Sequence, residues 1–297
     1  AGDHVVASPS VYGGTYNLLK YTLADLGIET TFVEDPDDLD AWRAAVRPNT
    51  KLFYGESVPN PRNDVLDIEP IAAIAHENGV PLIVDNTVPT PYLLRPIEHG
   101  ADVVVHSATK YLGGHGTSIG GVIVDSGNFD YGADPEKFPK FNQPAPGYHG
   151  LVYARDLGKD SAFGANLSYI LKARVSLLRD TGAAISPTNA FNIGIGLEPL
   201  SLRIERPIEN ATKVARWLEA NPQVDKVIWA GVESSPWYER AQKYLPKGPG
   251  AVLGFTLKGA TLEQTRDFVD ALKLHSNVAN IGDVRSLVIH PASTTHS

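Results

Sequence analysis

The first half of the chain alternates short apolar runs, rich in β-branched residues, with segments whose apolar residues recur at helical spacing. The pattern predicts strands at 4–8, 30–33, 51–54, 80–84, 102–106 and 122–124, and helices at 15–26, 37–46 and 67–78. The continuous apolar character of the last three strands predicts that they are buried. Strands that alternate with helices build an α/β domain with a largely parallel sheet, and such sheets bind ligands at the carboxyl ends of their strands.

The second half of the chain changes character. Tyr, Phe, Pro and Asn crowd together from about 129 to 150, as in an ordered surface excursion. Helical patterns return at 164–178, 190–206 and 208–220, and a strand–strand–helix–strand series follows at 224–229, 251–258, 262–272 and 286–290. We therefore expect a large domain over 1–204 and a small α/β domain over 205–297.

Composition excludes several kinds of site. The chain has 297 residues and no cysteine, so disulfides, thiolate metal sites and a cysteine nucleophile are ruled out. Its nine histidines lack metal-ligand spacing, and we expect no metal. The net charge of −8 argues against nucleic acid or an anionic membrane as partner, and no segment reaches the roughly 18–20 apolar residues of a membrane span. A reducing cytoplasm is the expected location.

Polar residues follow the ends of three predicted strands. Asp85 ends one apolar run, and Asn60 lies in the loop after another. Ser107, Thr109 and Lys110 follow a third. Taken alone, such an aspartate is often a turn former, and most lysines are solvated surface groups.

Together these residues match the needs of pyridoxal phosphate (PLP). This cofactor requires a lysine for a Schiff base with its aldehyde and a carboxylate that keeps its pyridine nitrogen protonated. It also requires hydroxyls and backbone N–H groups for its phosphate, and an aromatic face to stack on its ring. The glycine loop at 113–116 lets backbone approach such a ligand closely.

Five motifs in order along the chain resemble those of the Cys/Met-metabolism family of PLP-dependent enzymes, which have the aspartate-aminotransferase-like fold (fold type I). They are the tyrosine motif at 11–15, the Glu-Ser-x-x-Asn-Pro segment at 56–61, the aspartate motif at 84–87, the lysine signature at 107–111 with the glycines after it, and the block at 286–296. Five ordered motifs spanning nearly the whole chain are far more specific than any one of them.

The resemblance implies a role for each cofactor residue. Lys110 would hold PLP as a Schiff base and then, once freed, act as the general base for the Cα proton. Asp85 would keep the pyridine nitrogen protonated, and Tyr12 would stack on the ring and assist proton transfer. Ser107 and Thr109 would donate hydrogen bonds to the phosphate.

Two further residues are implied to contact the substrate or cofactor. Asn60 would reach the 3′-oxygen of PLP or the substrate carboxylate, and Ser286 would lie near that carboxylate. The excursion at 129–155 and the segment at 277–283 resemble the O-acetylhomoserine sulfhydrylase branch of the family. That branch implies a transferase of methionine biosynthesis, which replaces the acetate of O-acetylhomoserine by sulfide or a thiol to give homocysteine or methionine.

The same resemblance implies a homotetramer built from dimers that share their active sites. Cystathionine γ-synthase, O-succinylhomoserine sulfhydrylase and methionine γ-lyase remain alternatives, because one sequence fixes neither the acyl group nor the sulfur donor. The family's upstream Ser-Gly phosphate-binding turn, its Tyr/Arg pair and its arginine beyond residue 296 are not found in this stretch. With no methionine in the chain, we expect that the sequence is truncated at its N-terminus and also at its C-terminus.

Other classes of protein fit less well. Residues 116–120 match the Gly-x-Ser-x-Gly elbow of serine hydrolases with Ser118 as nucleophile, but that elbow needs a strand before it and a helix after it. Here a glycine loop precedes Ser118 and a predicted strand follows. The glycines at 113–121 do not form the dinucleotide-binding fingerprint. An inactive scaffold with the same fold is disfavoured by the presence of Lys110 and Asp85.

Overall fold

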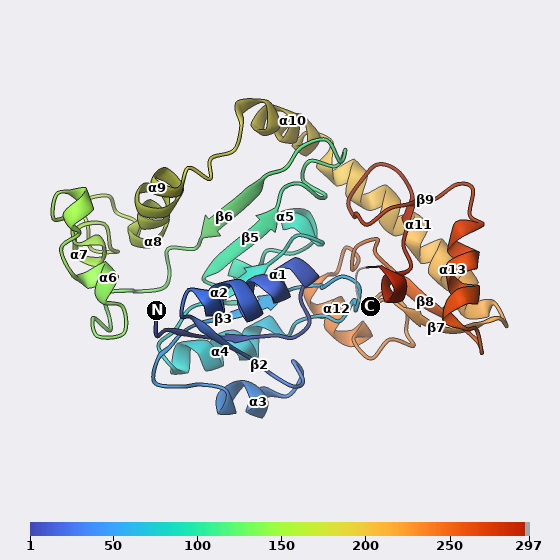
Figure 1. Ribbon diagram of the computed structural model, residues 1–297, viewed down its shortest axis with the longest axis horizontal. Coiled ribbons are helices and arrows are strands. Elements are labelled where there is room, and N and C mark those ends of the chain that lie inside the picture. The colour runs from blue at the N-terminus through green and yellow to red at the C-terminus, as the bar shows by residue number, and fades with distance from the viewer. Residues whose placement is uncertain (295–297) are drawn as a thin grey trace.

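A six-stranded sheet lies at the centre of the computed structural model, which describes residues 1–294 (Figure 1). The strand order is β2-β1-β3-β4-β5-β6, with β1 to β5 parallel and β6 antiparallel to β5. The strands are β1 (His4–Ala7), β2 (Glu29–Phe32), β3 (Thr50–Glu56), β4 (Leu82–Asp85), β5 (Val103–Ser107) and β6 (Gly121–Asp125). The predicted α/β class with a largely parallel sheet is confirmed.

Helices connect the parallel strands, as the apolar spacing predicts. They are α1 (Gly13–Asn17), which continues through a π-helical turn into α2 (Leu23–Asp25), then α3 (Leu39–Ala44), α4 (Ile68–Glu77) and the short α5 (Thr90–Leu93). α4 buries its isoleucine face in the main core, which also contains Trp42 of α3 and Phe53 of β3. This core fixes the strands whose carboxyl ends carry the polar residues.

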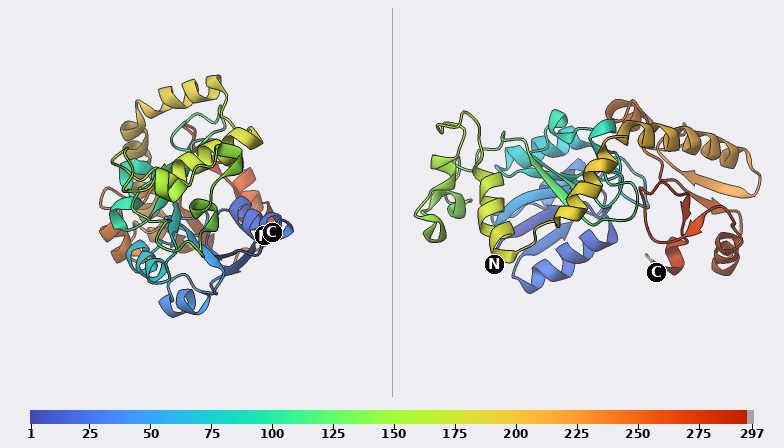
Figure 2. Two further views of the ribbon diagram at one scale, coloured as in Figure 1. Left: turned by 90° about the vertical axis from the view of Figure 1, so that its left-hand side faces the viewer. Right: turned by 90° about the horizontal axis from the view of Figure 1, so that it is seen from above.

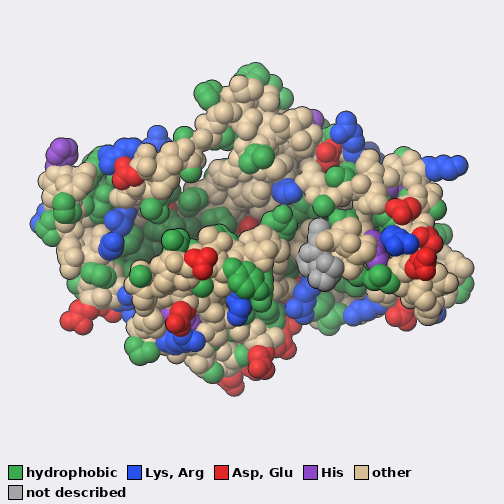
Figure 3. Space-filling view, in the orientation of Figure 1, with side chains coloured by type: hydrophobic (Ala, Val, Ile, Leu, Met, Phe, Trp, Pro, Cys, Tyr) green, Lys and Arg blue, Asp and Glu red, His purple; other side chains and the backbone are tan. Residues whose placement is uncertain are grey.

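β6 corrects the expectation of a buried strand at 122–124. Val122, Ile123 and Val124 are 40%, 48% and 40% exposed, because β6 is the edge strand and pairs with β5 alone among the described strands. An apolar groove runs between β6 and α8 (Ser168–Lys172), lined by residues that include Leu167 and Ile170. Figure 3 shows hydrophobic side chains gathered in a hollow on this side of the molecule.

The aromatic excursion is ordered and projects from the sheet at the left of Figure 1. It holds α6 (Pro139–Asn142), and α7 (Tyr153–Asp156) follows directly. The helix expected at 164–178 comes next as α8 and a π-helical stretch at Ala173–Leu178, which leads into α9 (Arg179–Thr181). Its own small core is aromatic: the ring of Tyr131 stacks on Phe141 at 4.3 Å and on Tyr169 at 5.6 Å. The predicted surface excursion is confirmed.

A long helix joins the sheet to the C-terminal region (Figures 1 and 2). α10 (Pro187–Leu197) ends before Pro199, and α11 runs from Leu200 to Ala220 through Pro207. The sequence pattern predicts two helices at 190–206 and 208–220, with a break at Pro207. The structure also has two helices here, but the break falls at Pro199, and Pro207 lies inside α11. α11 also crosses the expected domain boundary at 204/205 without interruption, so that division stays a prediction.

The C-terminal region holds small paired strands rather than one sheet. β7 (Val224–Ile228) pairs antiparallel with β8 (Gly254–Leu257), and β9 (Ser276–Asn277) pairs in parallel with β10 (Leu287–Val288). The helices are α12 (Tyr238–Tyr244) and α13 (Leu262–Asp270). Within residues 1–294, no helix combines the length and hydrophobicity needed to span a membrane.

Candidate functional site

The carboxyl ends of neighbouring parallel strands bring most of the predicted site residues to one edge of the sheet. In the ladder, Glu56 at the end of β3 lies opposite Asp85 at the end of β4, and Asp85 lies opposite Val105 of β5. The turn that carries Lys110 begins two residues beyond Val105, at Ser107. The loops after β1 and β3, with the predicted residues Tyr12 and Asn60, leave the sheet at the same edge.

Asp85 is held by a threonine that the sequence analysis did not assign to the site. The Thr87 hydroxyl donates to Asp85 Oδ1 at 2.6 Å, and the Thr87 N–H donates to the same oxygen at 2.9 Å. The Thr87 hydroxyl also accepts from the N–H of Ser107 at 2.8 Å and so ties the end of β4 to the end of β5. The available signal was the spacing of a threonine two residues after an aspartate at a strand end.

Burial raises the pKa of Asp85, and among the described residues only the two hydrogen bonds from Thr87 oppose this shift. Glu56 lies beside it, 4% exposed, and accepts the backbone N–H of Tyr12 at 2.7 Å. Burial, followed by the charge of Asp85, raises the pKa of Glu56. Within residues 1–294, no cation contributes to either shift, so the edge holds two adjacent carboxyl groups without a nearby positive charge.

Lys110 meets a neutral partner from the far end of the chain. Its Nζ donates to Asn280 Oδ1 at 2.6 Å. Burial lowers the pKa of Lys110, which increases the fraction of uncharged amine that can attack a carbonyl. The motif comparison covered residues 277–283 but did not single out Asn280, because nothing local in the sequence links two residues 170 positions apart.

The two predicted phosphate ligands differ in their present partners. The hydroxyl of Thr109 donates to the carbonyl of Gly120 at 3.2 Å and accepts the N–H of Gly120 at 3.1 Å, which anchors the loop before β6. Ser107 is only partly buried at the strand end, and its hydroxyl makes no hydrogen bond within residues 1–294. Ser107 is the freer donor, and both assignments stay predictions.

Within residues 1–294, the side chains of Tyr12 and Ser286 make no hydrogen bond to Asp85, Thr109 or Lys110. The ring of Tyr12 is 54% exposed before α1 and leaves a free aromatic face. Ser286 is exposed, and its carbonyl accepts the N–H of Ser276 at 2.9 Å beside the β9–β10 pair. The proposed contact of Ser286 with substrate stays a prediction. The last two residues of the C-terminal motif, Thr295 and His296, lie outside the described residues.

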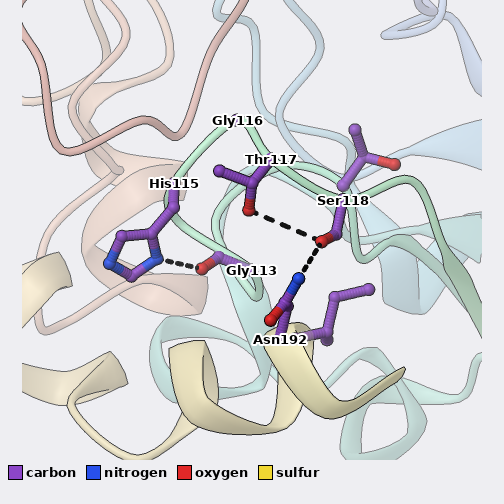
Figure 4. A pocket seen from close by; sticks show the side chains of 8 residues that line it. Gly113, His115, Gly116, Thr117, Ser118 and Asn192 are labelled. Atoms are coloured by element: carbon purple, nitrogen blue, oxygen red, sulfur yellow. Dashed lines mark hydrogen bonds between the residues drawn. The ribbon is translucent and has the colours of Figure 1, made fainter. Parts of the chain in front are cut away.

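A small crevice lies under the glycine loop, next to Thr109 (Figure 4). In it, Ser118 Oγ accepts from Asn192 Nδ2 at 3.2 Å, while the His115 ring bonds to the carbonyl of Gly113 at 2.7 Å and points away from Ser118. A loop precedes Ser118 and β6 follows it. The strand-before, helix-after geometry of a hydrolase elbow is therefore contradicted.

The residues at the sheet edge fit PLP. Asp85 is a partly buried carboxyl group beside which no cation lies within residues 1–294, and a protonated ring nitrogen would supply one. Lys110 offers a partly desolvated amine for the aldehyde, and Ser107 offers a hydroxyl. The chemistry of this donor set matches a group that carries an aldehyde, a basic heterocycle and an anion.

Comparisons with known proteins agree with this fit. The family model described as "Cys/Met metabolism PLP-dependent enzyme" matches residues 1–297. The O-acetyl-L-homoserine sulfhydrylase of Corynebacterium glutamicum is 54% identical over 300 residues, which cover 100% of this chain and 67% of that protein. The enzyme of the same name from Leptospira meyeri is 51% identical, with 100% and 66% covered. The chain spans about two thirds of the length of these relatives.

Solved structures give the same result. A putative O-acetylhomoserine (thiol)-lyase from Campylobacter jejuni, which contains a pyridoxyl-lysine phosphate, has a TM-score of 0.92 and 38% identity, with 100% of this chain and 68% of that chain covered. A cystathionine γ-lyase from Lactobacillus plantarum has a TM-score of 0.78 and 31% identity, with 100% and 66% covered. The predicted family resemblance and fold type I are confirmed.

Proposed function

The chain belongs to the Cys/Met-metabolism family of PLP-dependent enzymes, and on that premise we propose that it forms the cofactor-binding part of an O-acetylhomoserine sulfhydrylase. This transferase replaces the acetate of O-acetylhomoserine by sulfide or a thiol and yields homocysteine or methionine. The observation that carries the proposal is the combination of Lys110 and Asp85 at one sheet edge with roughly half-identical relatives of that name across the whole chain.

PLP, when bound, supplies an electron sink that makes protons at Cα and Cβ of an amino acid removable. The chain's own residues supply placement and proton transfer. Lys110 would hold the cofactor through its aldehyde and, with its amine free, would take the Cα proton, for which a lowered pKa suits it. Asp85 would keep the ring nitrogen protonated, and the Thr87 hydroxyl holds one oxygen of the Asp85 carboxylate.

The other site residues position the ligands. Ser107 would donate its hydroxyl to the phosphate, and Thr109 would do the same if its hydroxyl turned away from Gly120. Tyr12 would stack on the ring and assist proton transfer. Asn60 donates to the cofactor's 3′-oxygen or to the substrate carboxylate, and Ser286 approaches that carboxylate from the C-terminal region.

The absorbance spectrum of the full-length enzyme, recorded before and after borohydride, tests the cofactor assignment. We expect a band of lysine-bound PLP that borohydride removes and that the Lys110→Ala variant lacks. A band that persists unchanged in Lys110→Ala would rule out Lys110 as the cofactor lysine.

Homocysteine formation from O-acetylhomoserine and from O-succinylhomoserine, each with sulfide, tests the substrate. We expect the acetyl ester to be preferred. Formation of cystathionine from cysteine in place of homocysteine from sulfide would assign the enzyme to the cystathionine γ-synthase branch instead.

We also propose that the enzyme is a cytoplasmic homotetramer of dimers with shared sites. The exposed apolar side chains of β6 and α10, such as Ile123 and Phe191, support burial against another subunit. Light scattering of the purified full-length enzyme would give the mass of a monomer if this proposal is wrong.

A further inference from the structure

Arg203, in the first turn of α11, places its guanidinium against the turn that carries the candidate lysine. Its Nη1 donates to the carbonyl of Tyr111 at 2.9 Å and its Nη2 donates to the carbonyl of Leu112 at 3.2 Å. Nη2 also donates to the carbonyl of Gly196 near the end of α10. Tyr111 and Leu112 directly follow Lys110, so one side chain joins the lysine turn to the junction of α10 and α11.

The geometry of the turn explains why these carbonyls need a donor. The turn closes locally, because the Lys110 N–H donates to the Ser107 carbonyl at 3.1 Å and the Gly114 N–H donates to the Lys110 carbonyl at 2.8 Å. The chain then leaves the turn at Gly114, whose φ is +74°. The last carbonyls of a helical turn have no following N–H, and a cationic side chain satisfies them well.

The glycines around the guanidinium fit it closely. A Cβ atom on Gly114 would lie 2.1 Å from Nη1 of Arg203, and one on Gly196 would lie 2.1 Å from the carbonyl oxygen of Gly113. Backbone from α10 and from the lysine turn therefore approach each other as closely as glycine permits. The guanidinium therefore lies directly against the backbone that follows Lys110.

In the part of the chain that the structure describes, the charge of Arg203 has no offsetting ion pair. Burial alone shifts its pKa, downward, and no carboxylate among the described residues contributes. Its Nε is buried and lacks a hydrogen-bond partner within residues 1–294. The Arg203 side chain is partly buried, and its guanidinium meets only carbonyls. An apolar side chain would avoid this desolvation cost, so packing stability alone does not account for an arginine here.

We propose that Arg203 is a positioning residue, which fixes the turn after β5 so that the Lys110 amine is presented at the sheet edge. The inference rests on the proposed function, because it assigns to Arg203 the placement of the lysine that binds the cofactor. Arg203 does not touch the reacting atoms: it acts through the carbonyls of Tyr111 and Leu112.

The test compares Arg203→Met and Arg203→Lys with Arg206→Met in the full-length holoenzyme. Arg206 lies on the same helix, is 71% exposed and pairs with Glu209, so it is a matched control. The measurements are the fraction of PLP that borohydride fixes to Lys110, kcat, KM for O-acetylhomoserine, and the melting temperature. Because a displacement of about 1 Å costs up to about 10²-fold in rate, we expect kcat to fall by about 10–100-fold in Arg203→Met, with KM changed by less than about 3-fold.

Arg203→Lys should recover part of kcat, since an ammonium reaches one of the carbonyls, and Arg206→Met should match the wild type. The proposal is overturned if Arg203→Met fixes PLP to Lys110 and turns over as Arg206→Met does. It is also overturned if the melting temperature falls while kcat and the fraction of PLP fixed to Lys110 stay unchanged.

If Arg203→Met does not fold, Arg203→Lys and Gly114→Ala decide the matter. The new Cβ atom of Gly114→Ala would collide with the Arg203 guanidinium and displace it. A wild-type kcat in both variants would reject the positioning role of Arg203. A wild-type enzyme without a borohydride-sensitive band would reject the proposed function itself, independently of Arg203.

Discussion

The hydroxyl of Thr87 links the two strand ends that carry Asp85 and Ser107. Thr87→Val keeps the shape of the side chain but leaves the N–H of Ser107 without its acceptor. Since an unsatisfied buried polar group costs about 1–3 kcal/mol, we expect a loss of that size in the free energy of unfolding of the full-length enzyme, together with weaker PLP binding. Urea titration measures it. Thr87→Ser, which keeps the hydroxyl, should lose much less; equal losses in the two variants would assign the effect to packing.

Glu56 offers a prediction about pH at the same scale. Because burial and Asp85 raise its pKa in the folded chain, its ionised form is disfavoured there and folding favours the protonated form. Stability therefore falls as pH rises from the unfolded pKa, near 4.3, through the raised folded pKa. Glu56→Gln removes this penalty and keeps an oxygen for the N–H of Tyr12.

In the apoenzyme at pH 8, Glu56→Gln should therefore unfold at a higher urea concentration than wild type. Near pH 4, the urea midpoints of the two proteins should approach each other. A difference that does not depend on pH would show that the ionisation of Glu56 contributes nothing.

At the scale of elements, a histidine of α4 forms a hydrogen bond to the residue that precedes β5. His76 Nε2 lies 2.8 Å from Asp102 Oδ2, the oxygen that also accepts the N–H of Leu82 at 2.8 Å. The hydrogen bond to Asp102 raises the pKa of His76. The stabilisation is therefore complete below the unfolded pKa, near 6.5, and is lost as pH rises through the folded pKa.

We expect His76→Ala to have a lower free energy of unfolding than wild type at pH 5.5, and the difference between the two proteins should become smaller toward pH 9. The His76 side chain is 42% exposed, so solvent screening keeps the ionic part of the difference below about 1 kcal/mol. His275→Ala, at an exposed position, is the control. A gap that widens with pH would contradict the assigned pairing.

The elements and much of the sheet edge follow from local pattern, whereas the partners of the site residues do not. The isoleucine spacing of α4 and the polar residues after β4 and β5 are readable within short windows of sequence. The contacts of Lys110 with Asn280 and of Glu56 with Tyr12 join distant segments, which no local period encodes. β6 shows a second limit of local pattern. Its apolar run resembles that of a covered strand, yet β6 is an exposed edge strand, and the sequence alone does not distinguish the two positions.

At the scale of the whole molecule, the two expected domains share more than α11. Tyr244 of α12, in the expected small domain, is 2% exposed and belongs to the same buried cluster as Ile71 of α4. Its hydroxyl donates to Asp67 at 2.6 Å, and Trp237, just before α12, donates to Asp37 at 2.9 Å. The division at 204/205 therefore cuts through the main hydrophobic core, although a second cluster, which includes Ala215 and Val227, lies within the expected small domain alone.

A shared core predicts one cooperative unfolding transition for both regions. Tyr244→Ala removes a large side chain from that core and should cost about 3–5 kcal/mol, as for other buried aromatic residues. Calorimetry of the full-length enzyme should then show a single transition moved to lower temperature, whereas Tyr244→Phe, which loses only the hydroxyl, should move it much less. If the regions were independent domains, Tyr244→Ala would split the profile into an unshifted transition and a shifted one. Because Lys110 lies in one region and Asn280 in the other, a single transition would mean that the candidate site is lost at the same temperature as the fold.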